Sequence, residues 1–395
     1  MNNSIRNTTD HTDQTRQPTV RPPILWVPTG MFLVTTIGAL TLVPWYGLTY
    51  GYQTSAWVAW LVITWLTGMA ITGGYHRLWS HNAYDAHWLL RVWYALWGGA
   101  ALQNTILEWA SGHRKHHRHV DDEEHDPYSA RKGLWFSHIG WMLREYPAGV
   151  TNYANVQNLM KDPVVMWQQR HYVAIMLGMN IGVPVLLGLV LGDVWGMLLL
   201  AGLLRIVATH HVTFFINSIA HKWGSQPYTD ENTARDNPVF AFLTHGEGYH
   251  NYHHIFQNDY RNGVRWYQWD PTKWFIKACS WVGLASNLKT VSDFRIQRAR
   301  VQMQFKRAQE KLAARQLQDD EHRRWLDVLE REYEQFRGML NDWTSLQGER
   351  YENTRQNLID KWENAAVRTR YQALEYSLRM QQKRMQLLLN QLSMA

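Results

Sequence analysis

Four long apolar runs constrain the fold of this chain more than any other feature of its sequence. The runs occupy residues 24–50, 56–74, 173–191 and 194–216, and they are almost free of charged side chains. Each approaches or exceeds the length of about 20 residues that a helix needs to cross a bilayer. Short turns join the first run to the second and the third to the fourth. We therefore expect an all-α integral membrane protein with four transmembrane helices arranged as two hairpins.

The distribution of Lys and Arg predicts how these hairpins are oriented. Neither connecting turn contains a Lys or Arg, whereas the N-terminal segment and the long loops do. The basic residues on that side are Arg6, Arg16, Arg21, Arg77, Arg114, Arg118, Arg131 and Lys132. Because cytoplasmic loops are enriched in Lys and Arg, both termini and the long loops are expected in the cytoplasm. The net charge of +7 has the same explanation, so no nucleic-acid partner is expected.

The rest of the chain divides into three expected domains. Residues 1–23 are polar and lack the apolar core of a signal peptide, which predicts a disordered cytoplasmic tail. Residues 24–291 form the membrane domain. Within it, residues 88–109 are apolar but interrupted by polar side chains, which is typical of an interfacial or partly buried helix rather than a fifth crossing. A helical cap is expected on the cytoplasmic side of the four transmembrane helices.

Residues 292–395 differ from the membrane domain because they are rich in charge and contain no Pro. Apolar side chains recur there at intervals of three and four residues, which indicates helices with one buried face. They include Trp325, Leu329, Tyr333, Phe336, Leu340 and Trp343, then Leu374, Leu378, Met385, Leu388 and Leu392. This pattern predicts a coiled-coil-like extension or helical hairpin, through which copies of the chain could form a homo-oligomer.

Histidine carries the chemistry of the membrane domain. The only cysteine, Cys279, excludes an intrachain disulfide framework and any site built on several thiolates. Much of the histidine, by contrast, falls in four short segments on the expected cytoplasmic side. They read His76-Arg-Leu-Trp-Ser-His81, His113-Arg-Lys-His116-His117, Asn217-Ser-Ile-Ala-His221 and His250-Asn-Tyr-His253-His254.

The spacing within these segments points to a metal centre. Residues at positions i, i+3 and i+4 share one face of a helix, so the second and fourth segments each present three imidazoles together. With His76, His81 and His221 there are nine, enough for two first-row metal ions. Imidazole suits iron, zinc and copper alike. A redox metal beside an apolar cavity is what the oxidation of an unactivated hydrocarbon would require.

Residues 24–290 resemble the membrane fatty acyl desaturases, in particular the stearoyl-CoA desaturase type and its bacterial relatives. The four segments quoted above occur in the order of that family and with similar separations. The resemblance implies an enzyme that uses dioxygen and two Fe ions to place a cis double bond in a saturated acyl chain. It implies iron ligation by all nine histidines, His76, His81, His113, His116, His117, His221, His250, His253 and His254, with Asn217 reaching one iron through water.

The same resemblance places the substrate. It implies a bent acyl tunnel under the metals and a head group near four residues that match family positions, Gln103, Asn104, Arg131 and Lys132. We expect the tunnel floor at Thr64 and Gly68, small residues on the second transmembrane helix. Ser111 and Gly112 stand where animal enzymes of the acyl-CoA type have Arg-Asp. Acyl-CoA is the expected substrate, and phospholipid or acyl-carrier-protein substrates stay open.

Other functions remain alternatives at this stage. A lipid or alkane hydroxylase would use the same metals, and a non-catalytic membrane scaffold would work through the extension. The extension does not resemble a cytochrome b5 domain, so electrons are expected from a separate ferredoxin, cytochrome b5-like protein or flavin reductase. The resemblance to bacterial relatives favours a bacterial inner membrane as the location.

Overall fold

The computed structural model of the protein describes residues 21–315, 318–356 and 361–394, so most of the tail expected at residues 1–23 lies outside the described residues. Four helical segments in the described part are long and apolar enough to cross a membrane, as predicted. Their bounds are Trp26–Thr49, Thr54–Ser80, Pro163–Leu191 and Val194–His221. Tyr46 near the first turn donates a hydrogen bond of 3.2 Å to Asp193 in the second, so both turns lie at the same end.

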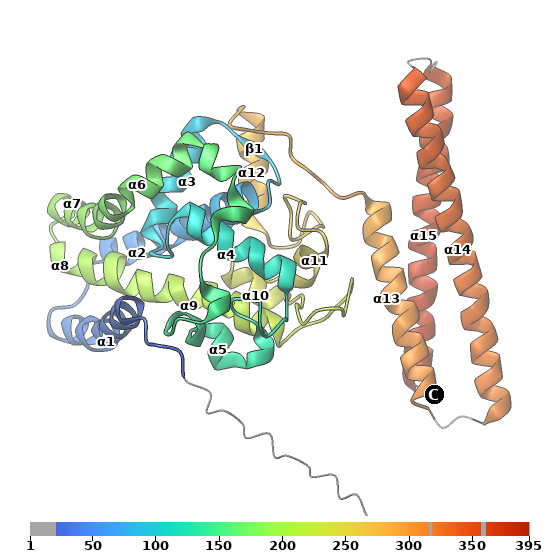
Figure 1. The fold of residues 1–395 in the computed structure, drawn as a ribbon, viewed down its shortest axis with the longest axis horizontal. Coiled ribbons are helices and arrows are strands. Elements are labelled where there is room, and N and C mark those ends of the chain that lie inside the picture. The colour runs from blue at the N-terminus through green and yellow to red at the C-terminus, as the bar shows by residue number, and fades with distance from the viewer. Residues whose placement is uncertain (1–20, 316–317, 357–360, 395) are drawn as a thin grey trace, which may run out of the picture.

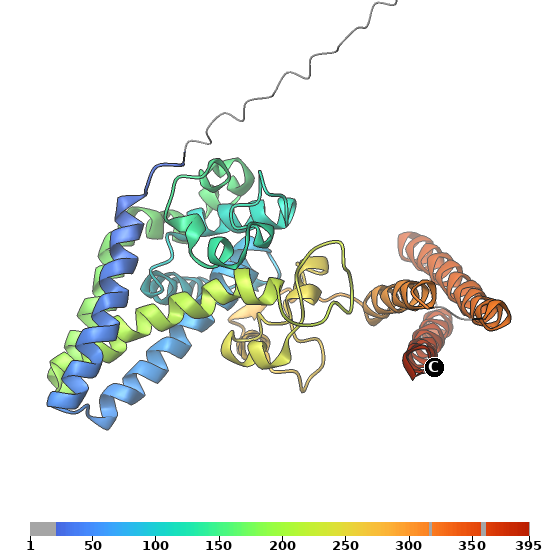
Figure 2. The same cartoon turned by 90° about the horizontal axis from the view of Figure 1, so that it is seen from below.

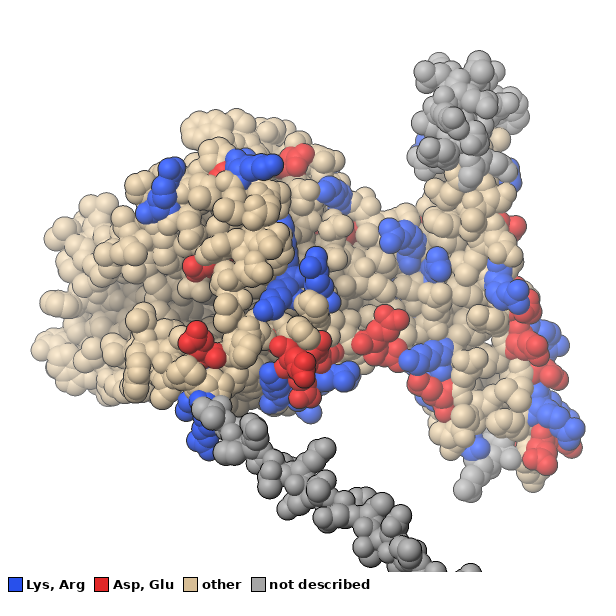
Figure 3. All heavy atoms as spheres, viewed as in Figure 1, with Lys and Arg blue, Asp and Glu red and all other residues tan. Residues whose placement is uncertain are grey.

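The first hairpin joins α1 (Trp26–Thr49) to α2 (Thr54–Met69), which continues as a π-helix, η1 (Ala70–Ser80). Only Ala39 and Val43 of α1 are buried, and Leu40 is 73% exposed. Apolar surface on this scale is rare on a soluble protein, whereas a lipid bilayer would cover it. Figure 3 shows few charged side chains over this part of the molecule.

The second hairpin joins two helices that each contain a π-helical stretch. The first helix consists of α6 (Pro163–Leu177), η7 (Gly178–Gly182) and α7 (Val183–Leu191). The second consists of α8 (Val194–Met197), η8 (Leu198–Leu204), α9 (Arg205–Ser218) and the 3-10 turn η9 (Ile219–His221). The first begins at Pro163 and not at residue 173, because Asp162 caps it and the polar Gln168 is buried against the backbone of Ile106 and Ala95.

The stretch expected at the membrane interface forms two helices, α3 (Trp88–Ala100) and α4 (Ile106–His119), neither of which is a candidate crossing. They are separated by a turn in which Leu102 and Asn104 both have positive φ. Arg205 donates a hydrogen bond of 2.6 Å to the carbonyl of Ala100, and His210 Nε2 lies 3.1 Å from that of Leu102. The fourth transmembrane helix therefore fixes the place where α4 begins.

Close packing between α3 and η1 sets the position of the first histidine segment. A Cβ atom added to Gly98 would lie 2.2 Å from the ring of Tyr75, and one added to Gly74 would lie 2.7 Å from Tyr94. Both tyrosines are fully buried. Because protein interiors have few voids, larger residues at these glycines would force the two helices apart.

Shorter elements build the cap on the expected cytoplasmic side. They are β1 (Asp85–Ala86) paired antiparallel with β2 (Ala285–Ser286), η2 (Ala130–Lys132), α5 (Leu134–His138), η3 (Gly140–Met142), η4 (Pro147–Gly149), η5 (Tyr153–Val156), η6 (Leu159–Lys161), α10 (Pro238–Leu243), α11 (His250–Ile255) and α12 (Pro271–Trp281). Figure 2 shows that α4, α5, α10 and α11 lie at the end of the bundle away from the hairpin turns.

The C-terminal extension contains one helix more than the expected hairpin. Its three helices are α13 (Asp293–Ala313), α14 (Asp319–Gln356) and α15 (Lys361–Met394), and they lie side by side in Figure 1. Phe294, Phe336 and Leu378 are buried in a shared core. The polar Gln381 in the middle of the apolar pattern is also buried, where it donates a hydrogen bond to the carbonyl of Glu332.

Helix α13 also packs against the membrane domain. Its Ile296 and Ala299 are buried in a cluster with Tyr228, Tyr252 and Phe256. Arg300 donates a hydrogen bond of 2.6 Å to the hydroxyl of Tyr228. Tyr252 lies within α11, so the extension contacts the helix that carries the fourth histidine segment.

Candidate metal centre

The first histidine segment lies on the π-helical stretch η1. His76 and His81 are five residues apart, and a hydrogen bond of 3.1 Å runs from the His81 amide to the His76 carbonyl. This i to i+5 bond is the repeat of a π-helix, which places residues five apart on one face. The two ring centroids are accordingly 4.8 Å apart. A regular α-helix would have turned His81 away from His76.

The other histidine segments lie on three short helical elements that meet η1. His113, His116 and His117 lie on α4, which begins with the side chain of Thr105 accepting a hydrogen bond from the Glu108 amide. His221 ends η9, and the last three histidines lie on α11. Seven of the nine side chains are buried, the partly exposed ones being His117 and His254.

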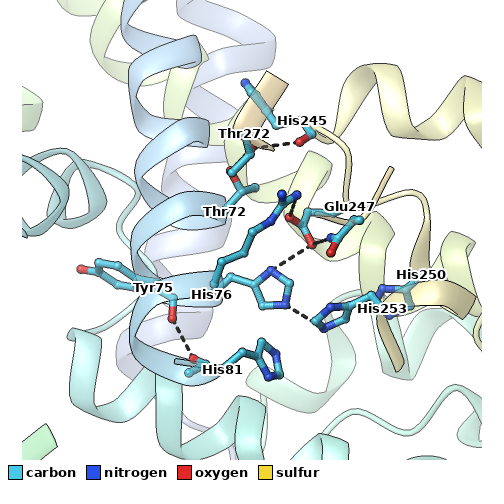
Figure 4. A network of polar contacts seen from close by, with 12 residues as sticks. Thr72, Tyr75, His76, His81, His245, Glu247, His250, His253 and Thr272 are labelled. Carbon is cyan, nitrogen blue, oxygen red and sulfur yellow. Dashed lines mark hydrogen bonds and ion pairs between the residues drawn. The ribbon is translucent and has the colours of Figure 1, made fainter. Parts of the chain in front are cut away.

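The nine imidazoles form two separate groups. One contains His76, His81, His113, His117 and His253, and the other contains His116, His221, His250 and His254. In each group, one potential ligand atom per residue lies within 4.8 Å of all the others. Figure 4 shows the ring of His76 next to those of His81 and His253, with a dashed line joining it to His253. The second and fourth segments each contribute to both groups, so the two sites adjoin.

The facing ring nitrogens are spaced as ligands of one ion would be. The Nε2 atoms of His76 and His253 are 2.9 Å apart, and the Nε2 atoms of His81 and His113 are 2.8 Å apart. In the other group, the Nε2 atoms of His250 and His221 are 3.1 Å apart. Ligands at right angles around an ion, each about 2.1 Å from it, would be about 3.0 Å apart. The donor set therefore fits metal ions.

Electrostatics keeps these side chains in the form that binds metals. For six of the histidines that lie outside the membrane-spanning segments, burial, followed by the effect of the neighbouring side chains, lowers the pKa well below the ordinary value. The six are His81, His113, His117, His250, His253 and His254. A neutral imidazole is required for coordination. These groups are thus neutral at physiological pH.

Carboxylates and hydroxyls hold the opposite nitrogens of several histidines. The Nδ1 atom of His76 lies 2.9 Å from an oxygen of Glu247, and that of His116 lies 2.9 Å from Asp126. The Nδ1 atom of His221 lies 2.8 Å from the Thr233 hydroxyl, which donates to Asp121. Such partners fix the orientation of a ligating imidazole and raise its basicity.

Glu247 is the residue of this centre that the sequence analysis did not single out, although it lies inside the quoted region before His250. It is buried, and Arg77 donates hydrogen bonds to it and to Asp270. Burial alone would raise the pKa of Glu247, but His76 and Arg77 lower it below its usual value. Glu247 is therefore ionised beside His76.

A cavity of about 660 Å³ opens next to the histidines. His76, His113, His116, His250 and Asn217 line one part of it. Apolar side chains line much of the remainder, including Met31, Phe32, Ile71, Trp109 and Phe214. The cavity thus combines potential metal ligands with walls that suit a hydrocarbon chain.

The expected substrate residues divide into two sets. Gln103 and Asn104 line the cavity, and Gln103 donates a hydrogen bond of 2.9 Å to Thr213. Arg131 and Lys132 are exposed and do not line it, although Lys132 lies 6.0 Å from the ring of Tyr146, which does. The cavity wall contains two cations that the sequence analysis did not single out, Lys115 and Arg144.

Thr64 and Gly68, which were expected at the tunnel floor, do not line this cavity. The Thr64 hydroxyl is bonded within its own helix to the Trp60 carbonyl. Gly68 instead faces His245, whose ring would lie 2.4 Å from an added Cβ atom. Ile71, Thr72 and His76, further along the same helical segment, line the cavity.

Comparisons with known proteins agree with this arrangement. A sequence model described as fatty acid desaturase matches residues 54–282. The chain is 45% identical over 247 residues to acyl-CoA desaturase 1 of Saccharomyces cerevisiae, covering 62% of this chain and 48% of that protein. It is 44% identical over 272 residues to a probable acyl-CoA desaturase of Schizosaccharomyces pombe, covering 68% of this chain and 57% of the relative.

A mammalian relative has a similar extent of match. The chain is 38% identical over 229 residues to stearoyl-CoA desaturase 5 of Homo sapiens, which covers 57% of this chain and 69% of that protein. The chain spans about half the length of the two yeast relatives. The matched region contains all nine histidines of the two groups.

Proposed function

The chain belongs to the fatty acid desaturase family, and from this premise we propose that it introduces a cis double bond into a saturated fatty acyl chain at a two-iron centre. One observation carries the proposal: nine imidazoles from four distant segments converge in two groups beside a cavity with apolar walls. That combination fits the dehydrogenation of a hydrocarbon, which needs both an apolar binding site and redox-active ions.

The proposed ligands follow the two groups. One iron would be held by His76, His81, His113, His117 and His253, and the other by His116, His221, His250 and His254, with Asn217 acting through water. Bound irons, with dioxygen and two electrons from a donor, would supply the oxidation that removes hydrogens from two adjacent methylenes. Glu247 and Asp126 keep His76 and His116 aimed at these positions.

The cavity would determine where on the acyl chain the reaction occurs. Ile71, Trp109 and Phe214 surround the space next to the histidines, so a bound chain loses contact with water there. Holding reacting atoms within about 3–3.5 Å of each other in a fixed orientation accounts for much of the selectivity of an enzyme. The shape of this wall would therefore select one pair of methylenes.

We propose acyl-CoA as the substrate form, in keeping with the names of the three relatives. Gln103 and Asn104 would bind the polar end of the acyl group inside the cavity. Lys115 and Arg144 line the same cavity, and the exposed Arg131 and Lys132 would meet the phosphates of the carrier. Ser111 is not free to bind the carrier, because its hydroxyl is bonded to Asn152 and Asn155.

Orientation and partners complete the proposal. Both termini and the metal centre would face the cytoplasm, since the two hairpin turns lie at the opposite end from the histidines. The three relatives named above are eukaryotic, so they do not support a bacterial inner membrane as the location. That part of the proposal depends only on the resemblance of the four histidine segments to bacterial members of the family. A separate ferredoxin, cytochrome b5-like protein or flavin reductase would supply electrons, and the C-terminal helices would mediate any self-association.

Product analysis tests this function. Purified protein would be assayed for iron, then incubated under reducing conditions with acyl-CoA, acyl-carrier-protein and phospholipid substrates. Gas chromatography should find an alkene from acyl-CoA with the parent and none with a His113→Ala variant. An alcohol as the product would instead support a hydroxylase. Protein that retains both irons and yields neither product with any substrate would support the scaffold.

A further inference from the structure

A third group of potential metal ligands lies outside the nine histidines. It consists of His119 at the end of α4 and of Asp122 and His125 in the turn that follows. One potential ligand atom from each of the three lies within 4.8 Å of the others. His119 is partly exposed and Asp122 and His125 are exposed, so an ion could reach them directly from solvent.

The backbone of the turn holds Asp122 in place. One carboxylate oxygen accepts hydrogen bonds from the amides of Glu124 and His125, at 2.8 and 3.1 Å. The other oxygen lies 2.9 Å from Nδ1 of His125. The ring of His119 lies 5.3 Å from that of His125. Two imidazoles and a carboxylate are therefore gathered without any rearrangement of the backbone.

We propose that His119, Asp122 and His125 bind a divalent ion of the zinc class on the surface of the protein. Two imidazoles and one carboxylate suit zinc or copper, with water completing the coordination. Magnesium and calcium prefer sites made only of oxygen ligands. The neighbouring exposed Glu123 and Glu124 add negative charge that attracts a cation to this turn.

The same turn supports the centre of nine histidines from its other side. Asp121 and Asp126 are buried, and they bond to Thr233 and His116 respectively. Asp126 also accepts a hydrogen bond of 3.0 Å from the Asp121 amide. An ion bound by the outer side chains would join the end of α4 to this turn. Binding should therefore raise the unfolding temperature of the protein.

Zinc titration of the purified full-length protein tests the site. Calorimetry and metal analysis would compare the parent with a His119→Ala/His125→Ala variant, and a His322→Ala variant on α14 serves as the control. The double variant should bind one zinc ion fewer per chain, and zinc should raise its unfolding temperature less. Equal zinc binding by the parent and the double variant would overturn the proposal.

A charge-neutral variant tests the role of the carboxylate. Asp122→Asn keeps an oxygen that can accept the two amide hydrogen bonds, so its unfolding temperature without zinc should match that of the parent. Its zinc affinity at this site should fall at least tenfold, and an unchanged affinity would contradict the assignment. The difference between parent and variant does not depend on which metal fills the nine histidines, so this test is independent of the proposed desaturase activity.

Discussion

The Nδ1 atom of His76 lies 2.9 Å from a buried carboxylate oxygen of Glu247. Asn262 donates a hydrogen bond to the same oxygen of Glu247, and Arg77 binds the other one. Figure 4 shows the ring of His76 between Glu247 and His253. The carboxylate thus leaves Nε2 of His76 free to face the metal position, and Arg77 compensates the negative charge that burial would otherwise disfavour.

Replacement of Glu247 should weaken iron binding without removing any ligand. Glu247→Gln keeps the size of the side chain but loses its charge, and loss of such a partner typically lowers metal affinity or activity about 10–100-fold. Iron content after dialysis against a chelator would measure this effect. Glu334→Gln, on the exposed surface of α14, should retain the iron content of the parent. Equal retention by both variants would show that Glu247 does not support the centre.

Ile71 should control the length of the acyl chain that is accepted. It is buried and lines the cavity within two turns of His76, so Ile71→Phe would fill part of the space. We expect the products to shift toward shorter chains, as measured by gas chromatography with a mixture of substrates. A product profile identical to that of the parent would contradict this role.

Gly68→Leu should have a different effect, because Gly68 faces His245 and not the cavity. The added side chain would collide with the His245 ring, and overpacking of this kind typically destabilises a protein by about 1–3 kcal/mol. The expected result is a lower unfolding temperature with an unchanged preference for chain length. A shift toward shorter products would instead support the expectation that Gly68 forms part of the tunnel floor.

Most of the ligand geometry could be predicted because it depends on local spacing. His113, His116 and His117 lie on a regular helix, so the i, i+3 and i+4 rule already placed them on one face, although it did not show that His116 joins the other group. The four transmembrane helices could also be predicted from the sequence, because an almost uncharged run of that length rarely forms anything other than a membrane-spanning helix. The resemblance to a known family then related the four segments to one another.

The remainder depends on tertiary packing that no local pattern encodes. The π-helical form of η1 brings His76 and His81 together, and the packing of Tyr75 against Gly98 accompanies it. Asp121 begins a run of four acidic residues, a pattern typical of a solvated loop, yet it is buried against Thr233. In the extension, α13 has a less regular apolar pattern because its buried side chains face both the bundle and the membrane domain.

The junction between α13 and α11 should affect the metal centre. Ile296 is 2% exposed and packs in the cluster that contains Tyr252, so Ile296→Ala should cost about 2–5 kcal/mol at this contact. We expect lower iron content, because Tyr252 directly precedes His253. Leu388→Ala, in the core of the bundle, should destabilise α15 while sparing iron. Equal iron contents in both variants would indicate that the extension only mediates assembly.

Asp236 should make the stability of the cap depend on pH. Burial raises the pKa of this carboxyl to about 7, although the amides of Tyr252 and Asn251 lower it. The folded protein therefore binds the proton more tightly than the unfolded chain, in which the pKa is about 3.9. The stabilisation from this proton is complete below about pH 4 and is lost as the pH rises through about 7.

Asp236→Asn resembles the protonated carboxyl at every pH, so it should remove this dependence. Relative to the parent, the variant should become progressively more stable between about pH 4 and pH 7, because only in the parent does unfolding release a proton over that range. Unfolding temperatures in detergent would be compared at each pH, with the exposed Asp320→Asn as the control. If the curves of parent and Asp236→Asn run parallel, the carboxyl is already ionised at the lower pH and burial does not retain its proton.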